Sequence, residues 1–349
     1  MAYDLSPREG DCPICGSDRA ELLHTISSRF TAQYYALRER EPERNERIRA
    51  EIERLWGGET CEIVRCRDCG FVYADPFVPG DGRFYSLFYD DPVFPKWKWE
   101  YEETCRILAD KQSEGTIPAE PRILEVGAGT GMFVKRLAGE ITPADHIVTV
   151  EYSDAGKREI EEGGIMCLQE DVRELPAEYD GTFDVICMYQ VLEHMDRLDP
   201  LFERLYRLAV PGALLFIAVP NDRMLTYYEE NDAWLDNAPV HVSRWNRTAF
   251  EKIGERHRWR LEDHQVEPDS RIWRFLQFSL YRYVHRTKRS GTVYNWAESR
   301  KSRLLRYLAQ VPLIGYQALR SPGAIRHLMP RNMGSSQMVL YIRESDMSE

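Results

Sequence analysis

The feature that most constrains this chain is the glycine-rich segment at residues 124–131, which reads Leu-Glu-Val-Gly-Ala-Gly-Thr-Gly. An apolar, strand-like run leads into it, and its alternating glycines allow a tight turn and a close approach of the backbone to a ligand. The turn opens a helix whose free N–H groups face the same point. Acidic residues recur at Glu151 and Asp171, where the next two strands are expected to end. The segment therefore predicts a site for a nucleoside-containing ligand.

The spacing of the glycines narrows the class of ligand. A dinucleotide site requires G-x-G-x-x-G, which would place glycine at position 132, but that residue is Met132. The observed pattern, Glu-x-Gly-x-Gly-x-Gly, resembles motif I of the class I S-adenosylmethionine (SAM) methyltransferases. SAM carries no phosphate and has a cationic ammonium group, which the carboxylate of Glu125 suits.

The order of strands and helices predicts an α/β fold with a doubly wound, Rossmann-like sheet. Short apolar runs alternate with amphipathic helical segments, as parallel β-α-β units require. Helices are expected to begin near Thr130, Asp154 and Leu198, with another from Asn246 to His257. The resemblance implies a seven-stranded sheet whose antiparallel last strand lies between the fifth and sixth. The predicted strands are 122–127, 146–151, 165–169, 182–188, 213–219, 259–266 and 337–343.

The resemblance also assigns residues to the SAM site. It implies that Glu151 accepts the ribose hydroxyl protons, that Tyr152 flanks the adenine, and that Asp171 meets the adenine amino group. The segment 188–194, Met-Tyr-Gln-Val-Leu-Glu-His, resembles the V-L-E-H segment of many small-molecule methyltransferases. The predicted SAM-binding residues are Glu125, Gly127, Gly129, Gly131, Glu151, Tyr152, Asp171, Val172 and Gln190. The predicted acceptor-site residues are Tyr189, Glu193 and Asn221.

Two histidines are candidates for the general base that a hydroxyl acceptor requires. His241 lies in a loop after the fifth strand and is the preferred catalytic residue. His194 follows the fourth strand and is either a second catalytic residue or a hydrogen-bonded structural one. Tyr85 and Tyr89, in the segment before the SAM domain, either cap the acceptor site or pack in the core.

Four of the eight cysteines form two C-x-x-C pairs, Cys12/Cys15 and Cys66/Cys69. Two such pairs predict a structural tetrahedral zinc site in a ribbon-like lobe. Their separation is longer than in a compact ribbon, so a helical insertion at about 28–56, with a break at Pro42, is expected between them. Redox-active or unliganded thiols are the alternative, and Cys61 is a competing ligand.

The layout as a whole resembles a group of bacterial class I methyltransferases with an N-terminal cysteine lobe. Their pattern is C-P-x-C-G, then R-C-x-x-C-G-F-V-Y-x-x-P, then the SAM domain, and the resemblance covers most of residues 10–265. Many members are associated with surface-polysaccharide, glycolipid or secondary-metabolite pathways. We therefore expect a zinc lobe at 1–80, a linker and leading helix at 81–120, and a SAM-dependent methyltransferase domain at 121–349.

Charge is distributed unevenly along the chain. The net charge is −11, but residues 271–334 hold 13 Lys/Arg and one acidic residue, so this segment carries +12 and the remainder −23. The segment is predicted to be a helical insertion before the last strand. Its aromatic and basic faces suit either a lid packed on the acidic body or, through 271–316, a peripheral contact with an anionic membrane or lipid-linked substrate.

The predicted activity is methyl transfer from SAM to a small-molecule, glycan or lipid-linked acceptor, at a hydroxyl oxygen. The alternatives are an RNA or protein methyltransferase that uses the zinc lobe and the basic insertion for recognition, and a non-catalytic SAM-binding protein. The acidic balance argues against a general nucleic-acid binder, and no DNA partner is expected. We find neither an apolar signal core nor an apolar run long enough to span a membrane, and expect a cytoplasmic location, with peripheral contact at the inner face of the membrane if the insertion binds lipid.

Overall fold

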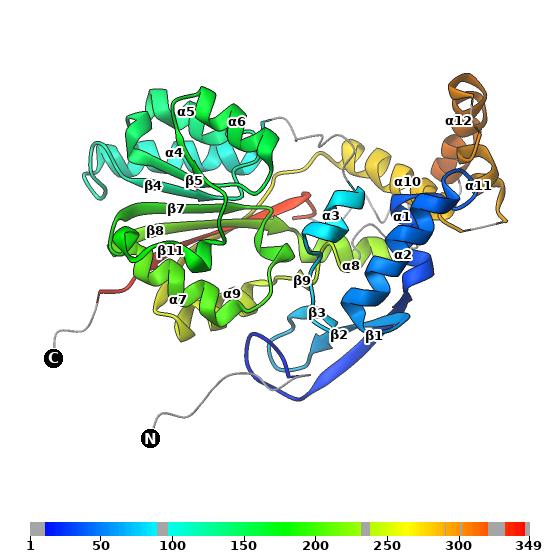
Figure 1. Cartoon of the computed structure of the whole chain (residues 1–349), viewed down its shortest axis with the longest axis horizontal. Coiled ribbons are helices and arrows are strands. Elements are labelled where there is room, and N and C mark those ends of the chain that lie inside the picture. The colour runs from blue at the N-terminus through cyan, green and yellow to red at the C-terminus, as the bar shows by residue number, and fades with distance from the viewer. Residues whose placement is uncertain are drawn as a thin grey trace.

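A seven-stranded sheet with helices on both faces dominates the computed structural model, which describes residues 11–88, 97–231, 238–289, 291–300, 302–319 and 332–345 (Figure 1). All seven strands that the sequence predicts are present. In chain order they are β4 (Ile123–Val126), β5 (Ile147–Val150), β6 (Met166–Leu168), β7 (Phe183–Tyr189), β8 (Ala209–Pro220), β10 (Trp259–Val266) and β11 (Ser336–Arg343).

The sheet has the order β10-β11-β8-β7-β4-β5-β6. Neighbouring strands from β4 to β8 pair in parallel, whereas β11 pairs antiparallel with both β8 and β10. The prediction of an antiparallel last strand between the fifth and sixth is confirmed. Because the parallel strands end at one edge of the sheet, the residues that follow β4, β5, β6 and β7 lie close together there.

Five helices cover the two faces of this sheet. On one face lie α4 to α6 and on the other α7 and α9 (Figure 1). Phe133 and Leu137 of α5 are buried on the first face, and Phe202 and Leu205 of α7 on the second. Burial of each such side chain contributes about 1.5–3 kcal/mol. The bounds are α4 (Trp99–Ser113), α5 (Met132–Glu140), α6 (Asp154–Glu162), α7 (Leu198–Leu208) and α9 (Arg247–Arg256).

Short elements complete the connections at the edges of the sheet. Helix α8 follows β8, and single turns of 3-10 helix follow or precede several strands. Their bounds are η1 (Ala144–His146), η2 (Val172–Glu174), η3 (Ala177–Tyr179), η4 (Leu192–His194) and α8 (Asp222–Glu230).

The N-terminal lobe contains a second sheet of order β1-β2-β3-β9. Its last strand, β9, comes from the chain beyond β8, so the lobe is completed by a distant segment. Pro42 is the first residue of α2, which confirms the predicted break in the helical insertion. Strand β1 was not predicted, because it is a largely exposed edge strand with few buried apolar positions. The elements are β1 (Ala20–Ser27), α1 (Ser28–Tyr35), α2 (Pro42–Trp56), β2 (Thr60–Cys66), β3 (Val72–Asp75), α3 (Gly82–Phe88) and β9 (Ser243–Arg244).

The lobe and the large sheet share one hydrophobic core. Phe71 after the second cysteine pair and Trp245 after β9 are both fully buried, with ring centroids 5.0 Å apart. Trp245 also stacks on Phe250 of α9 at 5.0 Å. These aromatic contacts join the cysteine turns to the helices under the sheet.

Helix α3 lies at the start of the segment 81–120, where a linker was expected before the leading helix. The carboxylate of Asp81 accepts a hydrogen bond from the Phe84 amide at 3.0 Å, and Phe84 is fully buried. A local cap and one buried aromatic ring therefore order a segment whose composition is typical of a loop.

The insertion before the last strand consists of α10 (Arg271–Thr287), α11 (Val293–Glu298) and α12 (Arg303–Leu319). Helix α12 continues through Pro312 to Leu319. Residues 320–331 of the predicted insertion lie outside the described part of the chain. Within the described residues, none of the helices combines the length and the apolar character that crossing a bilayer requires.

Helix α10 packs against both the body and the lobe. The ring of Phe278 lies 5.4 Å from that of Tyr228 on α8. The Tyr34 hydroxyl hydrogen-bonds to His285 Nδ1 at 2.6 Å, and Lys288 Nζ donates to the Tyr34 carbonyl at 3.1 Å. The lid interpretation of the insertion therefore describes α10 well.

We predict that Asn246 stabilises the contact between the lobe and the sheet. Its side-chain oxygen caps α9 at the Ala249 amide, 2.9 Å away, and its amide nitrogen donates to the Cys69 carbonyl at 3.2 Å. Asn246→Ala should lower the free energy of unfolding by about 1–2 kcal/mol in urea titrations, because both bonds are lost. Asn246→Asp keeps the cap and should lose about half as much. An Asn246→Asp variant as stable as the wild type would contradict a separate role for the Cys69 bond.

Candidate active site

The glycine turn after β4 has the conformation that its sequence demands. Gly127, Gly129 and Gly131 have φ of +73°, +57° and +70°, a region that L side chains rarely adopt. A Cβ atom on Gly127 would lie 2.4 Å from the Val191 side chain, and one on Gly131 would lie 2.7 Å from Ile160. Both the backbone conformation and the available space therefore require glycine here.

The carboxylate of Glu125, at the end of β4, is buried beside this turn. Its side chain is 1% exposed, and burial raises its pKa to about 8 against the opposing attraction of Lys98. Among the described residues, no group hydrogen-bonds to Glu125 Oε2. A buried carboxylate oxygen with an unmet hydrogen-bonding capacity suits a cationic group of a ligand.

Glu151 follows β5 and ties the turn to the neighbouring strand. Its Oε2 accepts a hydrogen bond from the Gly129 amide at 2.8 Å, and its Oε1 accepts one from the Ser153 amide at 2.8 Å. Each carboxylate oxygen has a second lone pair, so Glu151 can also accept hydroxyl protons from a sugar. The adjacent Tyr152 is 64% exposed, so its ring is accessible to a ligand at this edge.

Asp171 and Val172 follow β6, at the same edge of the sheet. The Asp171 carboxylate accepts hydrogen bonds from the Arg173 amide at 2.9 Å and from Arg173 Nε at 2.8 Å. Burial acts to raise the pKa of Asp171, but the hydrogen bonds from Arg173 hold it below its usual value. The side chain of Val172 is buried in the hydrophobic core that the lobe and the large sheet share.

Gln190 and Tyr189, at the end of β7, make contacts with the protein itself. Gln190 has φ of +58°, and its side-chain amide donates to Glu100 Oε1 at 3.1 Å and to Ser336 Oγ at 3.0 Å. The Tyr189 hydroxyl donates to Thr104 Oγ1 at 2.9 Å within the core. The contact of Gln190 with SAM and the contact of Tyr189 with the acceptor stay predictions.

Asn221 serves as a helix cap in the structure. Its side-chain oxygen accepts from the Arg223 amide at 3.2 Å, and its amide nitrogen donates to the carbonyls of Asn332 and Gly334 at 3.1 and 2.8 Å. It thereby ties the start of α8 to the chain before β11. The role of Asn221 at the acceptor site stays a prediction.

Glu193, His194 and His241 form one cluster, with donor atoms all within 4.8 Å of one another. The His194 and His241 rings meet edge to face with centroids 4.5 Å apart, and His194 Nε2 lies 3.9 Å from Glu193 Oε1. The Val240 carbonyl lies 2.7 Å from His194 Nδ1. Since a carbonyl can only accept, Nδ1 carries the proton, and in the neutral ring Nε2 presents a lone pair. Such a group can take a proton or bind a cation.

Tyr85 of α3 lies against this cluster. Its hydroxyl is 3.3 Å from His194 Nδ1, so the segment before the SAM domain does reach the histidines. Tyr89 lies outside the described residues.

The two cysteine pairs lie together in the lobe, against the core that it shares with the large sheet. Cys12 Sγ is 3.6 Å from Cys69 Sγ, Cys15 Sγ is 3.5 Å from Cys66 Sγ, and the four sulfurs lie within 4.8 Å of one another. Four sulfurs bound to one zinc at about 2.3 Å would be separated by about 3.8 Å. The donor set therefore fits tetrahedral zinc. Cys61 is not part of this group, and its thiol donates to the Glu62 carbonyl.

Sequence reasoning missed three charged residues around the turn. Lys98 and the buried Glu100 come from the start of α4, and Arg173 neutralises Asp171. Lys98 and Glu100 lie some 25 residues before the glycine turn, and no local motif marks them. The Arg173 pair could have been suspected from its i, i+2 spacing with Asp171.

Comparison with known proteins places the methyltransferase signature in the central part of the chain. Residues 97–263 match the family model described as "Methyltransferase domain". A biotin biosynthesis bifunctional protein BioCD from Bordetella avium is 32% identical over 122 residues, 34% of this chain and 26% of that protein. A ubiquinone biosynthesis O-methyltransferase from Chelativorans sp. is 29% identical over 103 residues, 29% of this chain and 40% of that protein. The chain thus spans less than half the length of either relative.

Solved structures of methyltransferases also resemble the fold. A SAM-dependent methyltransferase from Archaeoglobus fulgidus aligns with a TM-score of 0.44 at 16% identity, covering 74% of this chain and all of that one. Strands β4 to β8, which form the parallel part of the sheet, lie within the residues that match the family model. Residues 97–263 are therefore similar to a methyltransferase domain, and the sheet that they largely build has the strand order expected for a class I methyltransferase.

Proposed function

We propose that this protein transfers a methyl group from SAM to a hydroxyl oxygen of a small-molecule, glycan or lipid-linked acceptor. The observation that carries the proposal is the buried, unsatisfied Glu125 carboxylate beside a glycine turn, with Glu151 at the end of the next strand. Glu125 suits the ammonium group of SAM, and Glu151 suits the ribose hydroxyls. The relative from Chelativorans sp., which is named as an O-methyltransferase, favours oxygen as the acceptor atom.

In the proposed reaction, a lone pair on the acceptor oxygen attacks the SAM methyl carbon in line with the sulfur. The bond between sulfur and the methyl group breaks, and its electron pair stays on sulfur to give S-adenosylhomocysteine. The hydroxyl proton passes to a base, for which His241 is our first candidate. His194, whose Nδ1 is held by the Val240 carbonyl, is the second candidate or orients His241. The predicted SAM contacts of Tyr152, Asp171, Val172 and Gln190 belong to this proposal.

The proposal includes a structural zinc ion bound by Cys12, Cys15, Cys66 and Cys69. Zinc would supply no chemistry to methyl transfer. It would hold together the two cysteine turns, which share a core with Trp245. Because the chain around Trp245 leads back to His241, zinc would indirectly support the acceptor side of the site.

A peripheral contact with an anionic membrane through residues 271–316 is also proposed, since a lipid-linked acceptor would be met at such a surface. Large apolar side chains remain exposed on this insertion, whereas a lid packed entirely on the body would bury them.

We predict a charge-dependent role for Glu125 in SAM binding. In the folded protein Glu125 is protonated below its pKa of about 8. In the unfolded chain the same carboxyl ionises at about pH 4.3. The contribution of Glu125 to the free energy of unfolding therefore falls as the pH rises from about 4.3 toward 8. The ammonium group of SAM needs the ionised form. Calorimetric SAM affinity should therefore rise between about pH 6 and 7.5, a range below the α-amino pKa of about 8.

Glu125→Gln should weaken SAM binding about 10- to 100-fold and should abolish this pH dependence. The exposed Glu120→Gln is the matched control. A wild-type pH profile that persists in Glu125→Gln would show that another group titrates.

We predict that His241→Ala lowers turnover by about 100-fold or more and leaves SAM affinity unchanged. Turnover is measured as transfer of radiolabelled methyl from SAM into aqueous and lipid extracts of bacterial cells. His194→Ala tests the second histidine, and the exposed His146→Ala serves as the control. Unchanged turnover in His241→Ala removes this residue from the mechanism. SAM binding with no methyl transfer by the wild-type protein would favour a non-catalytic SAM-binding protein.

We predict about one zinc ion per chain in the purified protein, measured by plasma mass spectrometry. Cys69→Ser should lose the metal and lower the melting temperature, because metal binding and folding of the lobe are coupled. Cys61→Ser should retain the metal. Zinc well below one equivalent in wild-type protein, prepared without chelators, would contradict the assignment.

A further inference from the structure

Exposed apolar side chains are concentrated on the insertion. Of the fifteen large apolar side chains that are exposed among the described residues, eleven lie on α10 to α12, and the other four are Leu22, Met132, Tyr152 and Met166. Seven of the eleven are on α12, and Leu319 at its end is 88% exposed. The remaining six on α12 are Leu304, Leu305, Tyr307, Leu308, Val311 and Tyr316.

The exposed residues of α12 form a continuous stripe. Leu304, Leu308 and Val311 are spaced i, i+4 and i+7, which places them on one face of the helix. The other side of α12 faces the protein, where Gln317 is buried and hydrogen-bonds to the Tyr294 hydroxyl. Helix α12 is therefore amphipathic, with its apolar face turned away from the body. Soluble monomers rarely leave such a stripe uncovered.

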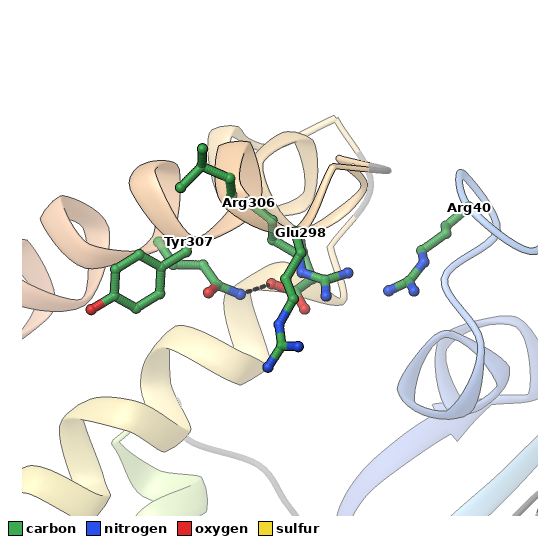
Figure 2. Close-up of a pocket in the computed structure, with 7 residues that line it drawn as sticks. Arg40, Glu298, Arg306 and Tyr307 are labelled. Atoms are coloured by element: carbon green, nitrogen blue, oxygen red, sulfur yellow. Dashed lines mark hydrogen bonds between the residues drawn. The ribbon is translucent and has the colours of Figure 1, made fainter.

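A cavity of about 620 Å³ lies at the beginning of this stripe and is lined by arginines (Figure 2). Arg303 and Arg306 come from α12, and Arg40 comes from the loop between α1 and α2. Leu304 and Tyr307 line the cavity and also belong to the apolar stripe, so the two surfaces are continuous.

The arginines of the cavity outnumber its one acidic residue. Glu298, which also lines the cavity, accepts hydrogen bonds from Gln310 Nε2 at 2.6 Å and from the Tyr283 hydroxyl at 3.4 Å. Within the described ranges, Arg40, Arg303 and Arg306 make no ion pair. The cavity thus presents three guanidinium groups and one carboxylate, and guanidinium groups bind phosphate with particular strength.

We propose that α12 lies on an anionic phospholipid membrane, with its apolar face at the boundary between headgroups and acyl chains and a lipid phosphate in the Arg40–Arg303–Arg306 cavity. Charge complementarity favours this occupant. A second copy of the chain would bring its own three arginines toward the same patch, whereas an anionic bilayer supplies both the apolar layer and the phosphate. The inference deepens the membrane contact of the proposed function and rests on it for the nature of the acceptor.

The test is co-sedimentation of the full chain with vesicles of phosphatidylcholine, alone or mixed with phosphatidylglycerol. We expect binding to the mixed vesicles that weakens as salt is raised. The double variant Arg303→Gln/Arg306→Gln should bind them about 30-fold more weakly. Arg158→Gln/Arg207→Gln removes the same charge from exposed sites on α6 and α7 and should bind as the wild type does. Leu304→Ser/Leu308→Ser should lose vesicle binding although its charge is unchanged.

Several results would overturn the inference. These are the absence of binding to phosphatidylglycerol vesicles at low salt, equal weakening by the two arginine pairs, and calorimetric binding of glycerol phosphate without vesicle binding. A dimer in sedimentation velocity that Leu304→Ser/Leu308→Ser dissociates, with no vesicle binding, would assign the stripe to a second copy. SAM binding is measured on the same protein without vesicles, so a failure of this inference is distinguishable from a failure of the proposed function.

Discussion

The contact on which the active site depends is the one between the Glu151 carboxylate and the two backbone amides of Gly129 and Ser153. One side chain fixes the glycine turn after β4 to the turn after β5, so the carboxyl ends of two neighbouring strands act as a unit. Charge-assisted hydrogen bonds of this kind are stronger than neutral ones. With the turn held, Glu125 remains buried beside it with one oxygen unsatisfied. A fixed backbone and a buried carboxyl group that can ionise beside a cation together suit this edge to a ligand with a cationic end.

A second set of hydrogen bonds connects the N-terminal lobe to the histidine cluster. The Val242 amide donates to the Glu193 carbonyl at 2.9 Å, and the Val242 carbonyl accepts from the Ala74 amide at 2.9 Å. The loop that carries His241 is therefore held between β3 of the lobe and the segment after β7. This arrangement gives the cysteine turns a role beyond their own stability, because the strands that they join position the loop that carries His241.

The fold was predictable because its signals are local and repeated. Apolar runs between amphipathic helices mark β4 to β8, and alternate glycines mark the turn, so the parallel part of the sheet and its edge follow from the chain alone. The place of the antiparallel last strand was implied by the family resemblance. The elements that sequence reasoning missed depend on distant partners. Strand β9 has two residues and exists because β3 lies beside it. Helix α3 is ordered by the burial of Phe84, and α12 continues through Pro312 although proline lacks the N–H that a residue inside a helix donates.

The residues of the candidate site also separate into those marked by a local motif and those placed by distant contacts. Glu125, Glu151 and the glycines could be read from a motif, whereas Lys98, Glu100 and Arg173 could not, because their roles depend on tertiary contacts.

The central claim is most directly tested by isothermal titration of SAM and S-adenosylhomocysteine into the full chain. The account predicts saturable binding of both ligands at one site per chain, with proton release at neutral pH as Glu125 ionises. Absence of binding by a folded, zinc-loaded protein would contradict it.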